Sequence, residues 1–198
     1  MGKSKIVYQH STPRGYFGIG VEGISKAMNL GNLFRTGHAF GASFAFTINA
    51  HYSLKLGKSD TSGTPANIPF FNFDAPDDLV LGEGCTLIGI EMVERATDLP
   101  SFYHPRCAAY VLGPERGELS PRLMDKCSQI VQIPAKFCIN VATAGAIVMY
   151  VRLINRRQFP DRPIGGTSAP TLRRAHVHGP PKRRTKDKKN NTTTKNTE

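Results

Sequence analysis

Tryptophan is absent from this sequence, and features that mark several protein classes are absent or rare as well. The four cysteines (Cys85, Cys107, Cys127 and Cys138) include no CxxC pair and do not cluster with the six histidines. This pattern argues against a zinc site and against a disulfide framework. Nothing resembling an export signal precedes the cysteines. We therefore expect reduced thiols, no bound metal and a cytoplasmic location.

Long hydrophobic runs are also absent. The longest apolar stretch, residues 141–151, is well short of the roughly 20 residues that a bilayer-spanning helix needs. It therefore predicts a buried helix, and no membrane segment is expected. Hydrophobic residues make up 39% of the chain, and 11 Phe and 6 Tyr supply the large side chains. This composition is typical of a globular protein with an ordinary core.

Acidic residues are few, since 15 of them face 26 lysines and arginines, which leaves a net charge of +11. Nine of the basic residues but only two of the acidic ones lie in residues 173–198. From about residue 160 onward the chain is rich in proline, glycine, asparagine, threonine and basic residues, a composition that cannot bury a core. We therefore predict one folded domain over residues 1–160, followed by a disordered basic tail over residues 161–198.

Short apolar runs alternate with helical or loop segments, which is the pattern of an α/β fold. Several runs are continuously apolar, as expected for strands that are covered on both faces of a mostly parallel sheet. The predicted strands are residues 16–21, 43–48, 86–92, 107–112 and 129–133, and the predicted helices flanking them are residues 29–40, 120–126 and 140–157. Residues 58–72, rich in Ser, Thr, Gly and Pro, are predicted to form a surface loop.

Three glycines, Gly18, Gly20 and Gly23, spell the GxGxxG pattern of dinucleotide-binding folds. In those folds the glycines follow a strand and open a helix, and a carboxylate comes about 20 residues later. Here the first two glycines lie inside a predicted strand, and residues 23–59 contain no acid. An NAD-dependent enzyme is therefore a minor alternative, which predicts NAD binding that is lost when Gly20 is substituted.

Three further segments stand at boundaries between predicted elements. In NLGNLFRT (residues 29–36), Asn29 is placed to cap a helix, and Arg35 follows near the end of its second turn. In YVLGPERG (110–117), a buried strand ends in a loop that presents Glu115. In IVQIP (130–134) and CINVA (138–142), a strand and a tight loop lead to a helix that opens at Asn140. Taken singly, these residues also fit plain structural roles: helix caps, a surface arginine and a solvated loop acid.

Together, the three segments closely resemble the motifs of the SpoU/TrmH branch of the SPOUT RNA methyltransferases, which read approximately NxGxxxR, GxExxG, and IPM followed by SLNVSxA. The resemblance spans about residues 16–157. It implies an α/β fold whose C-terminal part forms a trefoil knot, an exception to the rule that chains do not thread. It also implies a homodimer that transfers a methyl group from S-adenosylmethionine to a ribose 2′-hydroxyl of tRNA or rRNA, with neither DNA nor a membrane as partner.

The resemblance also implies roles for individual residues. Arg35 is implied as the catalytic residue near the ribose hydroxyl, supported by Asn29 and Glu115. An isolated guanidinium keeps its proton, so we expect Arg35 to bind the adjacent phosphate and to stabilise developing oxyanion charge. The residues implied to line the methyl-donor pocket are Leu112, Gly113, Gly117, Ile133, Pro134, Cys138, Ile139 and Asn140.

The sequence departs from the family pattern at two points. Cys138 stands where the family has a serine, and a thiol donates a weaker hydrogen bond than a hydroxyl. The interval from Ile133 to Asn140 is shorter than the common form, so the wall of the donor pocket is expected to differ in shape. The main alternative is therefore a non-catalytic knotted protein that binds RNA or assists ribosome assembly and does not bind S-adenosylmethionine.

Overall fold

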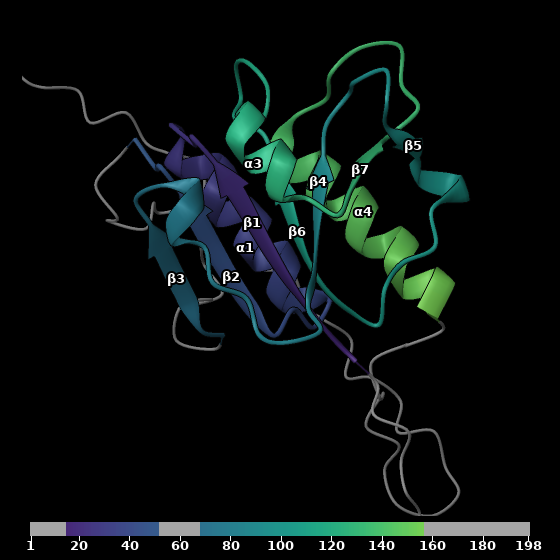
Figure 1. Cartoon of the computed structure of the whole chain (residues 1–198), viewed down its shortest axis with the longest axis horizontal. Coiled ribbons are helices and arrows are strands. Elements are labelled where there is room, and N and C mark those ends of the chain that lie inside the picture. Colours follow the sequence, from purple (N-terminus) through teal and green to yellow (C-terminus); the bar gives the residue numbers. More distant parts are fainter. Residues whose placement is uncertain (1–14, 52–67, 157–198) are drawn as a thin grey trace, which may run out of the picture. The chain divides into compact units, whose positions relative to one another are not determined.

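A computed structural model describes residues 15–51 and 68–156, which form one parallel sheet with helices on its faces (Figure 1). The strands are β1 (Tyr16–Glu22), β2 (Phe44–Ile48), β3 (Phe70–Phe73), β4 (Thr86–Ile90), β5 (Thr97–Asp98), β6 (Cys107–Leu112) and β7 (Gln129–Gln132). The helices are α1 (Ala27–Ala39), α3 (Pro121–Lys126) and α4 (Val141–Arg156), with single 3-10 turns η1 (Pro76–Asp78) and η2 (Leu99–Ser101). The predicted α/β class with a parallel sheet is confirmed.

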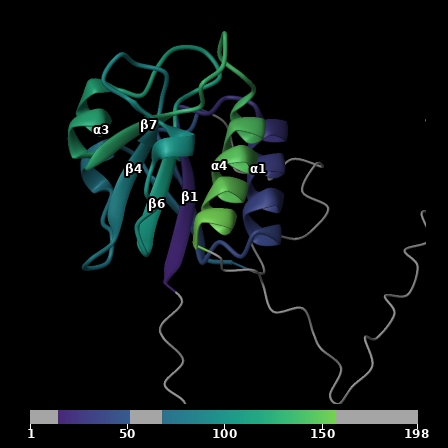
Figure 2. The same ribbon diagram turned by 90° about the vertical axis from the view of Figure 1, so that its right-hand side faces the viewer.

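Helices cover the two faces of the sheet unequally. Figure 2 shows α1 and α4 side by side on one face and α3 on the other. Successive residues of β6 alternate between these faces, so that Tyr110 packs in the core cluster under α1 and α4, whereas Val111 packs in the cluster that includes Leu123 of α3. Both side chains are fully buried, as the continuous apolar run predicted. No helix in the described ranges is long and apolar enough to cross a bilayer.

The strand order is β3-β2-β1-β6-β4-β7-β5, and every pairing is parallel. After β4 the chain forms the edge strand β5 and then returns to the middle of the sheet, where β6 lies between β1 and β4. It next crosses β4 to form β7 on the other side. It finally returns to place α4 beside α1. The trefoil knot stays a prediction, with which this repeated crossing is compatible.

The predicted surface loop is wrong at its C-terminal end. Phe70–Phe73 forms β3, which pairs in parallel with β2. The turn-forming composition of the preceding residues and Pro69 concealed this strand, although three phenylalanines in four residues favour one. Residues 58–67 of the predicted loop lie outside the described residues.

Helix starts agree with the predictions at two helices and differ at the third. Ser120 caps α3, since its hydroxyl oxygen accepts from the Leu123 N–H. Asn140 caps α4, since its Oδ1 accepts from the N–H groups of the second and third helical residues at 2.9 and 3.3 Å. Helix α1 begins at Ala27, so Lys26 takes the cap position and Asn29 lies inside the first turn. The predicted capping role of Asn29 is therefore wrong.

The glycines of the apparent dinucleotide motif have a packing role. Gly18 and Gly20 lie within β1, beneath two aromatic rings of the neighbouring strand β2. A Cβ atom at Gly18 would lie 2.2 Å from the Phe44 ring, and one at Gly20 would lie 2.4 Å from the Phe46 ring. Packing against these rings thus explains Gly18 and Gly20 without a bound nucleotide.

Substitution of Gly20 by alanine is expected to destabilise the protein by about 1–3 kcal/mol, because the added methyl group collides with a fully buried ring. Chemical denaturation of the wild type and the variant measures this loss. Gly82→Ala is the matched control, since its new Cβ would meet only the Tyr16 hydroxyl at 3.4 Å. Equal stability of wild type and Gly20→Ala would contradict the packing role.

Helix α4 is fastened to the sheet by Arg152, whose side chain is only 3% exposed. Its guanidinium donates hydrogen bonds to the backbone carbonyls of Tyr16 (3.2 Å), Pro105 (2.6 Å) and Arg106 (2.8 Å) and to the Tyr110 hydroxyl (3.2 Å). These partners lie at or near the amino ends of β1 and β6, far along the sequence from α4. Arg152 therefore holds the end of α4 against the edge of the sheet opposite the strands' carboxyl ends.

Candidate active site

A cavity of about 380 Å³ opens where β4, β6 and β7 end at their carboxyl termini. Ligands of open parallel sheets bind at this edge, and the volume lies within the usual range for small-molecule sites. The cavity is lined by Lys26, Asn29, Ile90, Glu91, Met92, Leu112, Gly113, Pro114, Glu115, Gly117, Ile133, Ala135, Phe137, Cys138, Ile139, Asn140, Val141 and Ala144.

Nearly all of the predicted site residues meet at this cavity. The exceptions are Arg35 and Pro134, which are not among the lining residues. Pro134 is exposed between two residues that do line the cavity, so it shapes the loop without forming the wall. Three segments far apart in the sequence thus contribute to one cavity, as the resemblance implied.

A chain of hydrogen bonds joins one residue from each of the three motifs. The Asn29 side-chain amide donates to Oε1 of Glu115 at 3.1 Å. The Asn140 amide donates to Oδ1 of Asn29 at 3.0 Å. Asn140 also caps α4, so the start of α4 and the first turn of α1 are fixed relative to each other. All three side chains lie in the cavity wall.

Glu115 holds the start of α1 from a distant loop. Its carboxylate accepts from the N–H and the hydroxyl of Ser25, both at 3.1 Å, and from the Lys26 N–H at 3.0 Å, in addition to the Asn29 amide. Lys26, at the cap position, has no side-chain oxygen that could accept from the helical N–H groups. Glu115 instead binds the N–H groups of the two residues before the helix and places a favourable negative charge at its amino end. Burial raises the pKa of Glu115, but the hydrogen bonds from Ser25, Asn29 and the backbone outweigh it and hold the pKa below its usual value.

The stabilisation from ionised Glu115 should depend on pH. Because its pKa is lower in the folded state, the contribution is complete above the ordinary carboxyl pKa and is lost as the pH falls through the folded-state value. We expect Glu115→Gln to reduce the free energy of unfolding by about 1 kcal/mol at pH 7. The difference from wild type should shrink steadily below about pH 4.5. Urea denaturation of both proteins at pH values from 7 to 3 measures this difference in the free energy of unfolding. A difference that does not change with pH would contradict a role for the charge of Glu115.

The sequence analysis missed several cavity residues, of which two, Glu91 and Lys26, are charged. Glu91 directly follows β4, and its Oε2 atom lies 2.6 Å from the position that a Cβ of residue 113 would take. A side chain at position 113 would therefore displace the Glu91 carboxylate, and its Cβ would also lie 3.2 Å from the Leu119 nitrogen. A carboxylate directly after a buried strand was the available signal for Glu91, whereas nothing in the sequence distinguished Lys26 from other lysines.

Carboxylates also hold the far end of the loop between β6 and α3. Glu91 Oε2 accepts from the Leu119 N–H at 2.9 Å. Glu22, which is 5% exposed at the end of β1, accepts from the N–H and the hydroxyl of Ser120 at 2.7 and 2.6 Å. With Glu115 bound to α1 near the start of the loop, three carboxylates fix the segment that forms one wall of the cavity.

Arg35 lies apart from this constellation. It is exposed on α1 and falls in the third turn, because the helix begins two residues earlier than predicted. Arg35 follows Asn29 by six helical positions, which corresponds to a rise of about 9 Å along the helix axis. Any contact between Arg35 and a substrate therefore lies outside the cavity itself.

The cysteines form no disulfide in the part of the chain that the structure describes. All four cysteines are free thiols, and Cys138 is exposed at the cavity. Among residues 15–51 and 68–156, no group of three or more His, Cys, Asp and Glu side chains is placed to bind a metal ion. The cavity wall instead combines apolar side chains, amides and carboxylates, a lining suited to an organic ligand.

Solved structures share this fold at low sequence identity. The SpoU methyltransferase AviRb from Streptomyces viridochromogenes, determined with AdoMet, is 19% identical with a TM-score of 0.65, covering 73% of this chain and 62% of that one. The TrmH/SpoU tRNA modifying enzyme of A. aeolicus is 17% identical with a TM-score of 0.63, covering 71% and 75%. A structure concerned with 2-OH methylation of C/U34 on tRNA is 16% identical with a TM-score of 0.62, covering 72% and 97%.

Comparison of the sequences gives the family. A search among curated proteins finds no significant match. The chain spans less than two thirds of the length of AviRb, so the likeness to that protein concerns the shared domain. The model of the SpoU rRNA Methylase family matches residues 17–150, which include all three motifs and every residue lining the cavity. This chain therefore belongs to the SpoU rRNA Methylase family.

Proposed function

We propose that this protein transfers the methyl group of S-adenosylmethionine to a ribose 2′-hydroxyl of RNA, with tRNA or rRNA as substrate. The observation that carries the proposal is the hydrogen-bonded chain of Asn29, Glu115 and Asn140 in the wall of the cavity. Three separate family motifs meet there, at the edge of the sheet where small ligands bind. The methyltransferase with bound AdoMet and the structure for tRNA 2-OH methylation share this fold, which supports the same chemistry here.

The cavity fits the methyl donor in chemistry as well as in size. Leu112, Ile133 and Ile139 provide an apolar wall for a purine ring, and Gly113 leaves the backbone accessible. The lining contains two carboxylates, Glu91 and Glu115, and one lysine, Lys26. This excess of negative charge suits a ligand with a positively charged sulfonium. When bound, S-adenosylmethionine supplies a methyl group already activated for transfer.

The protein's task is then mainly to position the ribose hydroxyl. Glu115 fixes the start of α1, and Asn29 and Asn140 present amide groups to the cavity. Arg35, exposed farther along α1, binds an RNA phosphate adjacent to the target ribose and stabilises negative charge that develops there. The hydroxyl proton leaves to phosphate or water, since a guanidinium does not accept it.

The assembly and location of the enzyme belong to the same proposal. We infer a cytoplasmic homodimer that acts on RNA and not on DNA. Tyr150 and Ile154, about half exposed on α4, support an apolar contact between two copies. The predicted tail, residues 161–198, lies outside the described residues, and its charge would add salt-dependent affinity for RNA phosphates. Light scattering on the full chain would distinguish a dimer from a 21.7 kDa monomer.

The decisive experiment supplies labelled S-adenosylmethionine and RNA that lacks the modification. Total tRNA and rRNA are incubated with the protein, digested to nucleosides and analysed by mass spectrometry. A 2′-O-methylated nucleoside confirms the proposed reaction and identifies the base. A methyl group on a base instead of the ribose would contradict it. RNA binding without donor binding or methyl transfer would favour the alternative of a non-catalytic RNA-binding protein.

A further inference from the structure

One aromatic side chain at the cavity is almost entirely exposed. Phe137 lies in the loop between β7 and α4 and lines the cavity, yet 74% of its surface is accessible. Its neighbours Ile133 and Ile139 pack against the main core, whereas Phe137 belongs to neither core cluster. Within the part of the chain that the structure describes, its ring makes no contact with another aromatic ring. Packing within the folded protein therefore does not explain why a phenylalanine stands at position 137.

The position of Phe137 separates it from the interior of the donor cavity. The inner wall already contains buried or half-buried apolar side chains, among them Leu112 and Ile133. A ring that is mostly exposed lies instead at the rim, with a large part of its surface directed to solvent. A donor molecule inside the cavity would leave that outer part available for a second ligand.

The charges around the rim indicate the chemistry of that ligand. Lys26 lines the cavity from the start of α1, and Lys136 is exposed directly before Phe137. The two carboxylates of the cavity, Glu91 and Glu115, are both engaged with backbone N–H groups. An exposed ring accompanied by lysine ammonium groups matches a ligand that combines flat bases with phosphates.

We propose that Phe137 stacks on an unpaired base of the RNA substrate, at or next to the nucleotide whose ribose is methylated. Stacking on aromatic side chains is the usual way in which proteins hold bases that have left a helix, and it accepts any base. Phe137 is thus a positioning residue, which places the ribose over the cavity while the donor lies within it. This inference rests on the proposed function, because it takes RNA as the substrate.

The test compares Phe137→Ala with Phe137→Tyr, which retains a stacking ring. We expect the alanine variant to raise the KM for total tRNA or rRNA about 5- to 100-fold, whereas the dissociation constant for S-adenosylmethionine changes less than twofold. The tyrosine variant should remain close to wild type. Tyr103→Ala is the matched control, since Tyr103 is 78% exposed but does not line the cavity.

The outcomes separate this inference from the proposed function. If wild type methylates RNA and Phe137→Ala has an unchanged KM for RNA, or weakens donor binding instead, the stacking role is wrong and the methyltransferase remains. If wild type transfers no methyl group but Phe137→Ala weakens binding of labelled total tRNA in a filter assay, the stacking role holds and the reaction is wrong. If the wild-type protein does not bind RNA, both the stacking role and the proposed reaction are wrong.

Discussion

Substitution of Arg35 by alanine is expected to lower kcat/KM for RNA methylation by about 10²- to 10³-fold, comparable to removal of one donor that stabilises a developing oxyanion. Arg35 is exposed, so the fold should be retained with a stability change within about 0.5 kcal/mol. Donor binding should also be unchanged, because Arg35 does not line the cavity. Initial-rate measurements on substrate RNA that lacks the modification, urea denaturation, and donor binding by calorimetry check the three expectations.

The variant Arg35→Lys tests how the side chain acts. Lysine keeps the positive charge but lacks the planar pair of N–H groups that binds two phosphate oxygens at once. We expect it to recover only part of the lost rate and to remain about tenfold below wild type. Activity close to wild type in Arg35→Lys would contradict bidentate phosphate binding. Full activity in Arg35→Ala would show that Arg35 takes no part in the reaction.

Replacement of Arg152 by methionine should produce the largest loss of stability, about 3–5 kcal/mol. Methionine retains much of the apolar stem, but three backbone carbonyls and the Tyr110 hydroxyl lose a charged donor in a buried place. Each buried polar group left without a partner costs about 1–3 kcal/mol. Since small domains are stable by only about 5–15 kcal/mol, much of the variant should unfold at moderate temperature. Thermal and urea denaturation measure the loss.

A surface arginine provides the control for this prediction. Arg122 forms an exposed ion pair with Asp77, and such pairs contribute at most about 1 kcal/mol. Arg122→Met should therefore change stability far less than Arg152→Met. Equal losses in the two variants would contradict the special role of the buried guanidinium.

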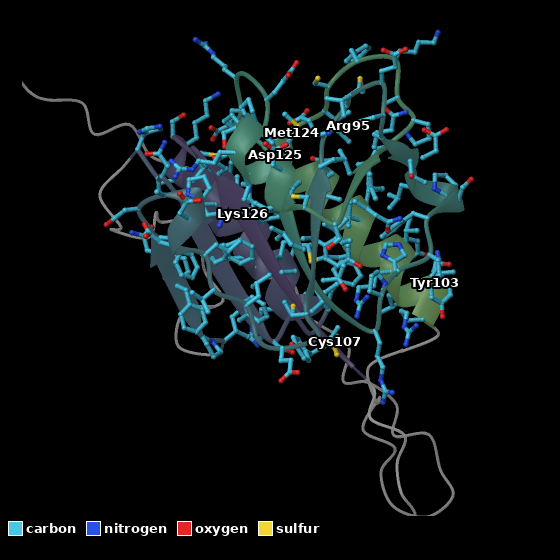
Figure 3. The ribbon with its side chains drawn as sticks, viewed as in Figure 1. Arg95, Tyr103, Cys107, Met124, Asp125 and Lys126 are labelled. Carbon is cyan, nitrogen blue, oxygen red and sulfur yellow. The ribbon has the colours of Figure 1, made fainter. Side chains whose placement is uncertain are left out.

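The residues around Arg152 explain why no neighbouring group should replace its hydrogen bonds when it is substituted. The His104 Nδ1 atom lies 2.7 Å from the Tyr110 hydroxyl that also accepts from Arg152. Burial, with the nearby positive charge of Arg152, lowers the pKa of His104 to about 4, so the imidazole is neutral at physiological pH. Nearby, Tyr103 lies beside the carboxyl-terminal end of α4 (Figure 3) and accepts a hydrogen bond from Arg156. The four acceptors of Arg152 are separate neutral oxygens, and the single ammonium group of a lysine could not donate to all of them.

Much of this architecture was predictable from local sequence. Continuous apolar runs such as residues 107–112 identified the buried parallel strands, because a strand covered on both faces has no polar side. Ser120 and Asn140 were correctly placed at helix starts, since capping depends on a side chain and the next few backbone N–H groups. The motif residues Glu115 and Asn29, which only the family resemblance linked, line one cavity, and their catalytic roles stay a prediction.

What only the tertiary structure decided depends on contacts between distant segments. Asn29 resembled a helix cap in the sequence, yet its side chain and the two N–H groups before α1 bind Glu115, whose carboxylate comes from a distant loop. No local pattern predicts such a partner, because the acceptor and the N–H groups become neighbours only when the sheet forms. The same holds for Glu91, whose carboxylate lies against Gly113, and for Arg152 among distant carbonyls. The sequence by itself thus determined most of the elements and the family motifs, because these depend on local patterns. Three-dimensional packing decided which side chains share the cavity and left Arg35 outside it.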